Sequence, residues 1–367
     1  MNKNKNYIRE DKTMGKTVKA MLFTHNDLDG AGCTTIFELA FRHLEEAVEW
    51  ATYICSNEGI DEKVLSAWQR NKFNKNTLIC FADIVPSRAV LESLIVNGYK
   101  NIKIFDHHIT SKWVEELLPN EQIIVENSFG KPECGTSLMY QFFSKLSVDE
   151  PNNPCGFNFS ETHNKNLKVL SEYVEGIRSY DTFEWKLTND IVAKKLNTMF
   201  QMLGTKIFSR KYTKRCLGLD EVNTLFSKTE EEFINARIIM ENDAISRYDI
   251  SKLYYMDIKG LKTAVKFTGG DGIPVSEFSY KFLEKYPEID MFVGINLAAG
   301  TFAYRTQRSD LNVATFIAEP LSGGGHAKAA GSVIPIQLRA NILNNLVHYI
   351  DKFSKELQYE KVIKGKK

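Results

Sequence analysis

The sequence has almost no net charge, and it also lacks long hydrophobic runs. Its 47 lysines and arginines nearly balance 46 aspartates and glutamates, giving a formal net charge of +1. A balanced chain has no strong positive field around the whole molecule, so a large footprint on long duplex nucleic acid is not implied. An acidic partner must instead be met by a local patch.

Membrane-spanning and secretory signals are absent from the sequence. No stretch of 18 or more apolar residues is present, and the opening residues MNKNKNYIREDKTMGK lack the apolar core of a signal peptide. We therefore expect a cytoplasmic protein with no membrane partner. The six cysteines form no CxxC pair, and several lie in apolar surroundings such as LICFAD, so we expect reduced, mostly buried thiols.

Residues 19–108 alternate short apolar runs with amphipathic stretches of helix length. Strands spaced by single helices indicate βαβ crossovers and a parallel sheet. The predicted strands are KAMLFTH, WATYICS, TLICFADI and NIKIFDHH. A further helix, KVLSEYVEGIRSYDTFEW, is expected to end near Asp181 and to add a helical layer to the same domain.

The second half of the chain predicts a connector and a smaller domain. Residues 214–249 are predicted to be helical, with Ser227 or Thr229 as the N-cap. Beyond them come the strand-like runs LYYMDIKG, LKTAVKFT, DMFVGINLA and TFAYRTQ, and the helices PVSEFSYKFLEKYP, LNVATFIAEP and QLRANILNNLVHYIDKFSKEL. We predict an α/β protein with a parallel-sheet domain over residues 17–213, a helical connector over 214–250 and an α/β domain over 251–357, with the active site in the cleft between the domains.

Acids and imidazoles follow three of the predicted strands where each strand ends. The loops at the carboxyl edge of a parallel sheet meet at one rim, where ligands gather. We expect these side chains to converge there. They are His25, Asp27 and Asp29 after the first strand, Asp83 after the third, and Asp106, His107 and His108 after the fourth.

A mixed set of carboxylates and imidazoles predicts a metal centre. Mn²⁺ accepts carboxylate oxygen and imidazole nitrogen, so this set suits a first-row metal better than calcium. Crowded carboxylates repel one another until a cation neutralises them. The candidates exceed the needs of one ion, whereas two ions sharing a bridging carboxylate, roughly 3.5–4 Å apart, fit the count and suit phosphoryl displacement.

Each motif alone has a simpler interpretation. HNDLDG is compatible with an acidic turn containing a capping aspartate, Asp83 with an N-cap, and SGGGH with a flexible turn. Gly135-Thr136-Ser137 is most simply a capped helix start without chemistry. The run 206–215 contains five basic residues, Phe208 and Tyr212, and a solvated helix face is favoured there over contact with a nucleic-acid backbone. The occurrence of these acidic and histidine motifs in order, each at the end of a strand, favours a functional metal site.

The motifs HNDLDG, FADI, DHH and SYDTF resemble, in this order, the four motifs of the DHH phosphoesterases. SGGGHAKAAG, with Tyr304 and Arg305 upstream, is similar to the signature of the DHH-associated C-terminal domain. The resemblance covers roughly residues 19–335. Many family members place the histidine four residues before the first aspartate, whereas His25 precedes Asp27 by two, which leaves the role of His25 open.

The resemblance implies a role for each matching residue. Asp106 would orient His107, and His108 would contact the scissile phosphate. Arg305 would act on the substrate's phosphate together with Gly323, Gly324, Gly325 and His326. One Mn²⁺ would be held by His25, Asp27 and Asp83, and a second by Asp29, Asp83, His107 and Asp181, with Mg²⁺ or Co²⁺ as alternatives.

The resemblance further implies hydrolysis of a phosphodiester by metal-activated water. The chain looks most like the oligoribonuclease branch, also associated with cyclic-nucleotide hydrolysis, so the expected partners are short RNA oligonucleotides or small nucleotides. Alternatives are a phosphatase for 3′-phosphoadenosine 5′-phosphate, a cyclic (di)nucleotide phosphodiesterase and a non-catalytic module that binds nucleotides or RNA ends. A non-haem iron centre is disfavoured by the surplus of acids. The sequence leaves the oligomeric state open, including a homodimer.

Overall fold

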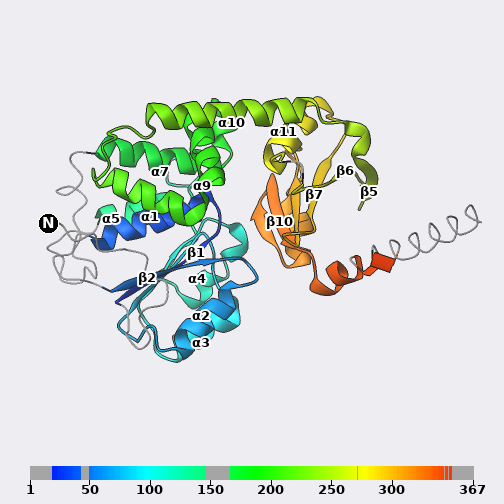
Figure 1. The fold of residues 1–367 in the computed structure, drawn as a ribbon. Coiled ribbons are helices and arrows are strands. Elements are labelled where there is room, and N and C mark those ends of the chain that lie inside the picture. The colour runs from blue at the N-terminus through cyan, green and yellow to red at the C-terminus, as the bar shows by residue number, and fades with distance from the viewer. Residues whose placement is uncertain are drawn as a thin grey trace, which may run out of the picture. The chain divides into compact units, whose positions relative to one another are not determined.

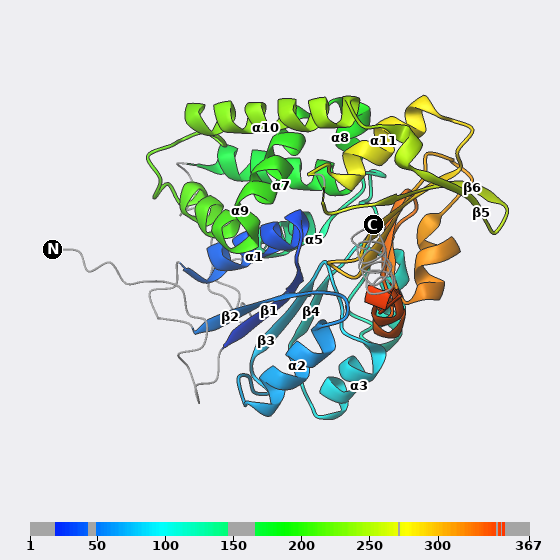
Figure 2. The same cartoon turned by 45° about the vertical axis from the view of Figure 1, so that its right-hand side comes forward.

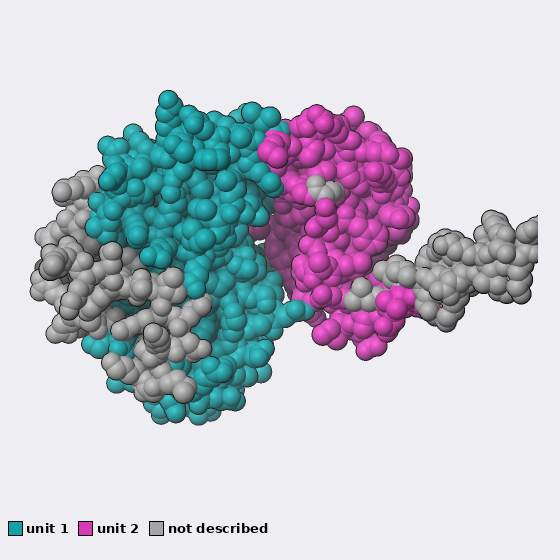
Figure 3. Space-filling view, viewed as in Figure 1, with its two compact units in different colours: residues 1–239 teal, residues 240–367 magenta. Residues whose placement is uncertain are grey.

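The computed structural model describes residues 19–42, 49–145, 166–270, 272–342, 344–345 and 347–348 (Figure 1). The chain divides into two compact units, residues 1–239 and 240–367, which are coloured separately in Figure 3. The division falls inside helix α10 (Lys228–Ser246), within the range predicted as the connector.

A four-stranded parallel sheet forms the centre of the first unit. Its strands are β1 (Ala20–His25), β2 (Trp50–Cys55), β3 (Leu78–Ala82) and β4 (Ile102–Phe105), in the order β2-β1-β3-β4. The predicted parallel sheet is therefore present. Because all four strands run in the same direction, the residues that follow β1, β3 and β4 emerge at one edge of the sheet.

Alternating side chains of these strands belong to two apolar cores, one on each face of the sheet. Helices α2 (Ile60–Gln69) and α3 (Arg88–Val96) cover one face, and α1 (Leu28–Arg42) and α5 (Gly135–Lys145) lie on the other (Figure 2). In β1, Leu22 belongs to the core beneath α1, and Phe23 to the core beneath α2. Short segments η1 (Ile109–Ser111) and α4 (Val114–Leu117) follow β4.

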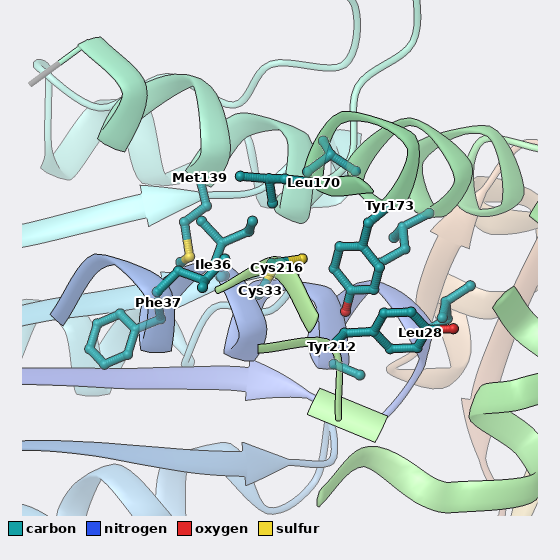
Figure 4. Packing of buried hydrophobic residues seen from close by; sticks show 14 of the residues in the cluster. Leu28, Cys33, Ile36, Phe37, Met139, Leu170, Tyr173, Tyr212 and Cys216 are labelled. Atoms are coloured by element: carbon teal, nitrogen blue, oxygen red, sulfur yellow. The ribbon is translucent and has the colours of Figure 1, made fainter. Parts of the chain in front are cut away.

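Two long helices form a further layer over α1. The first of them is the helix that was predicted to end near Asp181 and to add a helical layer. Helix α7 (Leu167–Asp181) and helix α9 (Ile191–Cys216) pack on α1, with short α8 (Glu184–Thr188) between them in the chain. In Figure 4 Tyr173 from α7 and Tyr212 from α9 lie in this core, and their rings are stacked 4.8 Å apart. Tyr212 and Phe208 are thus core residues and are not part of a solvated face.

The predicted continuous helix over residues 214–249 is wrong in one respect. Helix α9 ends at Cys216, and α10 begins only at Lys228. The second helix starts there because Ser227 and Glu230 form a capping box: the Glu230 amide donates to Ser227 Oγ (3.2 Å), and the Ser227 amide donates to Glu230 Oε2 (2.8 Å). The predicted cap at Ser227 is confirmed.

The second unit is built on a six-stranded mixed sheet in the order β5-β6-β7-β8-β10-β9. Helix α11 (Val275–Lys285) packs on one face, and the short π-helical segment η3 (Ala314–Ala318) packs on the other. The strands are β5 (Tyr254–Ile258), β6 (Leu261–Phe267), β7 (Met291–Asn296), β8 (Thr301–Arg305), β9 (Gly324–His326) and β10 (Ala329–Val333).

The glycine-rich segment after η3 is a β-hairpin, which the apolar pattern did not predict. Strand β10 pairs with both β8 and β9, so β9 is an edge strand. The described part of the predicted final helix is helical from residue 336, and the remainder lies outside the described residues. Among the described helices, none combines the length and the apolar character needed to cross a bilayer. Five of the six cysteines are free and buried, and Cys155 lies outside the described residues.

Candidate metal centre

The turn between β1 and α1 directs two side chains of the first motif toward each other. His25 is the last residue of β1, and its Nδ1 donates to Asp27 Oδ2 over 2.6 Å. The other oxygen of Asp27 accepts the Gly30 amide at 2.9 Å and so caps α1. The interpretation of HNDLDG as a turn with a capping aspartate is therefore confirmed, and the same aspartate also belongs to a histidine–carboxylate cluster.

Asp29 lies in the first turn of α1 and is held by the start of a second helix. The amides of Gly135 and Thr136 donate to its two carboxylate oxygens at 2.7 and 2.8 Å. A Cβ atom at position 135 would lie 2.9 Å from Asp29 Oδ2 and 3.1 Å from the Cβ of Asp83, so only glycine fits. Gly135 and Thr136 were expected only to begin a helix, because nothing in the sequence shows that they meet a carboxylate 106 and 107 residues away.

Asp83 occupies the centre of the cluster. It follows β3 with a positive φ of 60°, and its amide donates to the Phe105 carbonyl at 3.0 Å. Its carboxylate is buried, and Oδ2 receives no hydrogen bond from the residues that the structure describes. Two sets of three side chains each bring candidate ligand atoms within 4.8 Å of one another, and Asp83 is in both: His25, Asp27 and Asp83, and Asp29, Asp83 and His107.

The DHH motif follows β4 and differs in one contact from the expected arrangement. Asp106 was expected to orient His107, but its Oδ1 accepts a hydrogen bond from the ring Nδ1 of His108 at 2.7 Å. The same oxygen accepts the amides of His107 (2.8 Å) and His108 (3.2 Å). The turn after β4 folds the second histidine back over the aspartate, so Asp106 fixes the ring of His108 and the backbone of His107. Burial would raise the pKa of Asp106, but the charge of His108 and its hydrogen bond lower it.

Asp181 is the last residue of α7 and meets the cluster from the helical layer. Its Oδ2 lies 3.0 Å from His107 Nε2. Behind it, the buried guanidinium of Arg178 donates to the Pro132 carbonyl at 2.8 Å and also bonds Glu175 and Glu184. These contacts tie the C-terminal end of α7 to the loop before α5, which fixes the position of Asp181.

The charges of the cluster favour a bound cation. Burial raises the pKa of Asp83 well above its usual range, and repulsion from Asp27 and Asp29 adds to the shift. Burial and the nearby charge of Asp181 raise the pKa of Asp29 to about 6. A divalent cation between these carboxylates would turn the repulsion into attraction. The buried Asp83 Oδ2 without a donor, together with a donor set of oxygen and nitrogen, fits Mn²⁺ or Mg²⁺.

Two histidines in the cluster carry partner carboxylates. Burial alone would raise the pKa of Asp27, but the charge of His25 and its hydrogen bond lower it to about 2. Burial alone would lower the pKa of His107, but the hydrogen bond and the charge of Asp181 raise it to about 9. Because a metal ligand must be a neutral imidazole, a cation held by His107 would displace this proton.

The predicted substrate-binding residues lie together on the second unit. The strand register pairs Arg305 with Ala329, and Ala329 with His326, so these residues share one row and one face of the sheet. The row continues into Phe292, which packs against α11, so this is the α11 face. The guanidinium of Arg305 donates to the Tyr304 carbonyl (2.8 Å), the Ala330 carbonyl (3.2 Å) and Ser276 Oγ (3.0 Å).

The three glycines before His326 lead into the edge strand β9 and allow the chain to lie close to β10. Gly323 lies against β10, where a Cβ atom would sit 2.1 Å from the Gly331 carbonyl oxygen. Gly324 and Gly325 then belong to β9. SGGGH is thus a strand start fitted against its neighbour and is not a loose turn.

Comparison with known proteins gives one curated relative and several related structures, although no family model matches the chain. The chain is 26% identical over 325 residues to oligoribonuclease NrnB of Bacillus subtilis (strain 168), covering 85% of this chain and 72% of that protein. It matches the DHH domain of a member of the s1p family of ribosomal proteins with a TM-score of 0.56 and 14% identity, over 91% of this chain and 86% of that chain. Exonuclease RecJ bound to manganese matches with a TM-score of 0.47 and 14% identity, over 90% and 89% of the two chains.

A parallel sheet carries carboxylates and imidazoles at its carboxyl edge, where they could hold a metal ion, and the chain continues into a second α/β unit. The four motifs occur in order, and the chain is similar in sequence to a curated oligoribonuclease and in fold to a DHH domain.

Proposed function

We propose that this chain hydrolyses short oligoribonucleotides to mononucleotides with two divalent metal ions, preferentially Mn²⁺. The observation that carries this proposal is the membership of buried Asp83 in two adjacent ligand sets. The curated relative, named an oligoribonuclease, supports the choice of substrate.

The proposed ligands follow from the cluster. His25, Asp27 and Asp83 would hold one ion, and Asp29, Asp83, His107 and Asp181 the other. Bound metal ions of this kind lower the pKa of water and neutralise charge on the phosphoryl oxygens.

The protein side chains position the phosphate and supply no nucleophile of their own. His108 donates through Nδ1 to Asp106, which orients the ring so that Nε2 can meet a phosphate oxygen. Burial raises the pKa of the nearby Cys33 and Cys134 thiols well above the usual range, so neither is a thiolate. In the proposed reaction, the oxygen of water bonds to phosphorus and the water gives up a proton, while the bond to the leaving ribose oxygen breaks and that oxygen takes up a proton.

The second unit is proposed to recognise the substrate's phosphate. Arg305 and His326 share a sheet face, and β9 offers the outer side of an edge strand lined by glycine. Guanidinium and glycine backbone groups are suited to an anion because they donate several hydrogen bonds without steric obstruction.

A substrate panel tests the proposal. With Mn²⁺, we expect turnover of a diribonucleotide and a pentaribonucleotide that exceeds turnover of 3′-phosphoadenosine 5′-phosphate and cyclic AMP. Preference for either of the last two would select the corresponding alternative activity. Nucleotide binding without turnover of any of the four would indicate a non-catalytic module and contradict the proposal.

A further inference from the structure

Helix α9 has an unusual charge content for this balanced chain. Its 26 residues, IVAKKLNTMFQMLGTKIFSRKYTKRC, include seven lysines and arginines and no aspartate or glutamate. Since the whole chain carries a net charge of only +1, this helix is a local concentration of positive charge.

Three of these cations are paired with acids from the segment that follows α9. Lys195 contacts Glu231 at 2.7 Å, and Lys211 contacts Glu230. The buried Arg215 contacts Glu230 at 2.7 Å and Asp220 at 2.8 Å. These pairs join α9 to α10 and are structural.

Three others form an exposed line that we call the α9 stripe: Lys206, Arg210 and Lys214. They are four residues apart, so they lie along one side of the helix with a rise of roughly 6 Å between successive members. Among the described residues, no acid lies within ion-pair distance of Arg210 or Lys214. The like charges of Arg210 and Lys214, four residues apart, repel each other, and a bound polyanion would offset this repulsion.

The α9 stripe begins beside the metal cluster. Gly204 interrupts α9 with φ 69° and ψ 164°, and the second half of the helix starts at Thr205. Thr205 Oγ1 donates to Asn26 Oδ1 at 2.7 Å, and Asn26 lies between His25 and Asp27 in the chain. One turn later, Ser209 Oγ donates to the Ala31 carbonyl at 3.0 Å. The stripe therefore leads away from the cluster along the first unit.

We propose that the α9 stripe binds the sugar-phosphate backbone of a single-stranded oligonucleotide, beyond the phosphodiester that is cleaved. The inference rests on the proposed function and extends it to substrate length. The spacing of roughly 6 Å exceeds the 3.4 Å rise per nucleotide of a stacked strand, so Arg210 and Lys214 meet different phosphates. Phe208 and Tyr212 are buried and cannot stack on bases, so the stripe reads no base sequence.

The test is a charge reversal of Arg210→Glu with Lys214→Glu. The matched control, Arg70→Glu with Lys75→Glu, makes the same change in net charge at exposed positions after α2, on the other side of the sheet. We expect the stripe variant to raise KM for a pentaribonucleotide at least tenfold and to affect a diribonucleotide less, with the control close to the native chain. The milder Arg210→Gln with Lys214→Gln should fall between them.

Binding of a labelled pentaribonucleotide in EDTA, followed by fluorescence anisotropy, provides a readout without turnover. Loss of two phosphate contacts should reduce the slope of log K against log salt by about 1.4. If the stripe variant keeps the native affinity and salt slope for the pentaribonucleotide, or if the control loses as much, the proposal that the stripe binds the oligonucleotide is wrong. Turnover of the diribonucleotide would still support the proposed function. If the native chain hydrolyses neither oligonucleotide, the proposed function fails, and anisotropy alone decides on the stripe. Selective loss of binding to phosphatidylserine vesicles, with oligonucleotide binding intact, would identify a lipid surface and overturn the proposal.

Discussion

At the scale of single residues, the carboxylate of Asp27 divides its two oxygens between fold and site. One oxygen caps α1 through the Gly30 amide and the other contacts His25. The sequence left a helix cap and a metal ligand as alternatives for Asp27, because residue types alone cannot show that one carboxylate caps a helix and also contacts a histidine. The sequence could not predict the hydrogen bonds from the Gly135 and Thr136 amides to Asp29, since they depend on how α5 packs against α1.

Substitution of Asp83 tests the shared ligand directly. In Asp83→Asn we expect Mn²⁺ affinity to fall by more than the roughly 10–100-fold typical of residues that only support a ligand. The metal-free variant should unfold at no lower a temperature, because the change removes repulsion with Asp27 and Asp29. Calorimetric titration and thermal unfolding measure both effects. Asp190→Asn, which retains an N-cap on α9, is the control and should bind Mn²⁺ normally.

Gly135 provides a second test at this scale. In Gly135→Ala the new Cβ meets Asp29 and Asp83, so we expect a loss of about 1–3 kcal/mol in the free energy of unfolding. Mn²⁺ affinity should fall about 10–100-fold because Asp29 is displaced. Denaturant titration and metal titration measure these changes. In Gly59→Ala the nearest atom is Oγ of the exposed Ser56 at 3.0 Å, so stability should change by less than about 0.5 kcal/mol. Equal effects of the two substitutions would argue against the close fit at Gly135.

At the scale of elements, the pattern of apolar residues predicted the elements with a clear apolar run and missed those without one. The strands β1, β3 and β4 appear where continuous apolar runs end in polar residues, because a sheet covered on both faces needs such runs. The full extent of α9 was missed because its apolar residues are interrupted by cations and by the kink at Gly204. The β9–β10 hairpin was missed because glycine and alanine carry no strand signal.

The junction between α9 and α10 predicts a dependence of stability on pH. Burial would raise the pKa of Glu230, but hydrogen bonds from Arg215 and Lys211 lower it to about 2. A carboxyl with a lowered folded-state pKa stabilises the fold above its unfolded pKa and loses this effect as pH falls toward the folded value. Between about pH 5 and pH 2 the native chain should therefore lose up to about 3 kcal/mol from this group.

Glu230→Gln should remove this part of the pH dependence. At pH 7 the variant should be less stable by about 2–3 kcal/mol, because the buried Arg215 keeps only Asp220 as a charged partner. Urea unfolding at a series of pH values measures the difference. The exposed Glu232→Gln should follow the native curve, and a parallel acid profile for Glu230→Gln and the native chain would refute the assignment.

At the scale of the whole molecule, the net charge is nearly neutral, but positive and negative side chains gather in different regions. The sequence predicted that an acidic partner must meet a local patch, and the cations of α9 and the acids at the sheet edge are separate regions of the first unit. Total charge cannot reveal such a division, because it depends on which residues folding exposes and which it pairs. The two ligand sets that contain Asp83 use residues of the first unit, whereas Arg305 and His326 belong to the second.

This division predicts which part of the molecule a metal ion stabilises. All four tryptophans, at positions 50, 68, 113 and 185, lie in residues 1–239, so tryptophan fluorescence reports the unfolding of the unit that holds the cluster. A ligand that binds only the folded state at 100 times its Kd stabilises it by about 2.7 kcal/mol, which corresponds to about 5–10 °C for a unit of this size. We therefore expect saturating Mn²⁺ to raise the fluorescence-detected Tm by this amount and EDTA to reverse it. Hydrogen exchange should slow at residues 25–30, 83 and 106–108 and stay unchanged in β5 to β10. A similar Tm shift in Asp83→Asn, or protection confined to the second unit, would place the ion elsewhere.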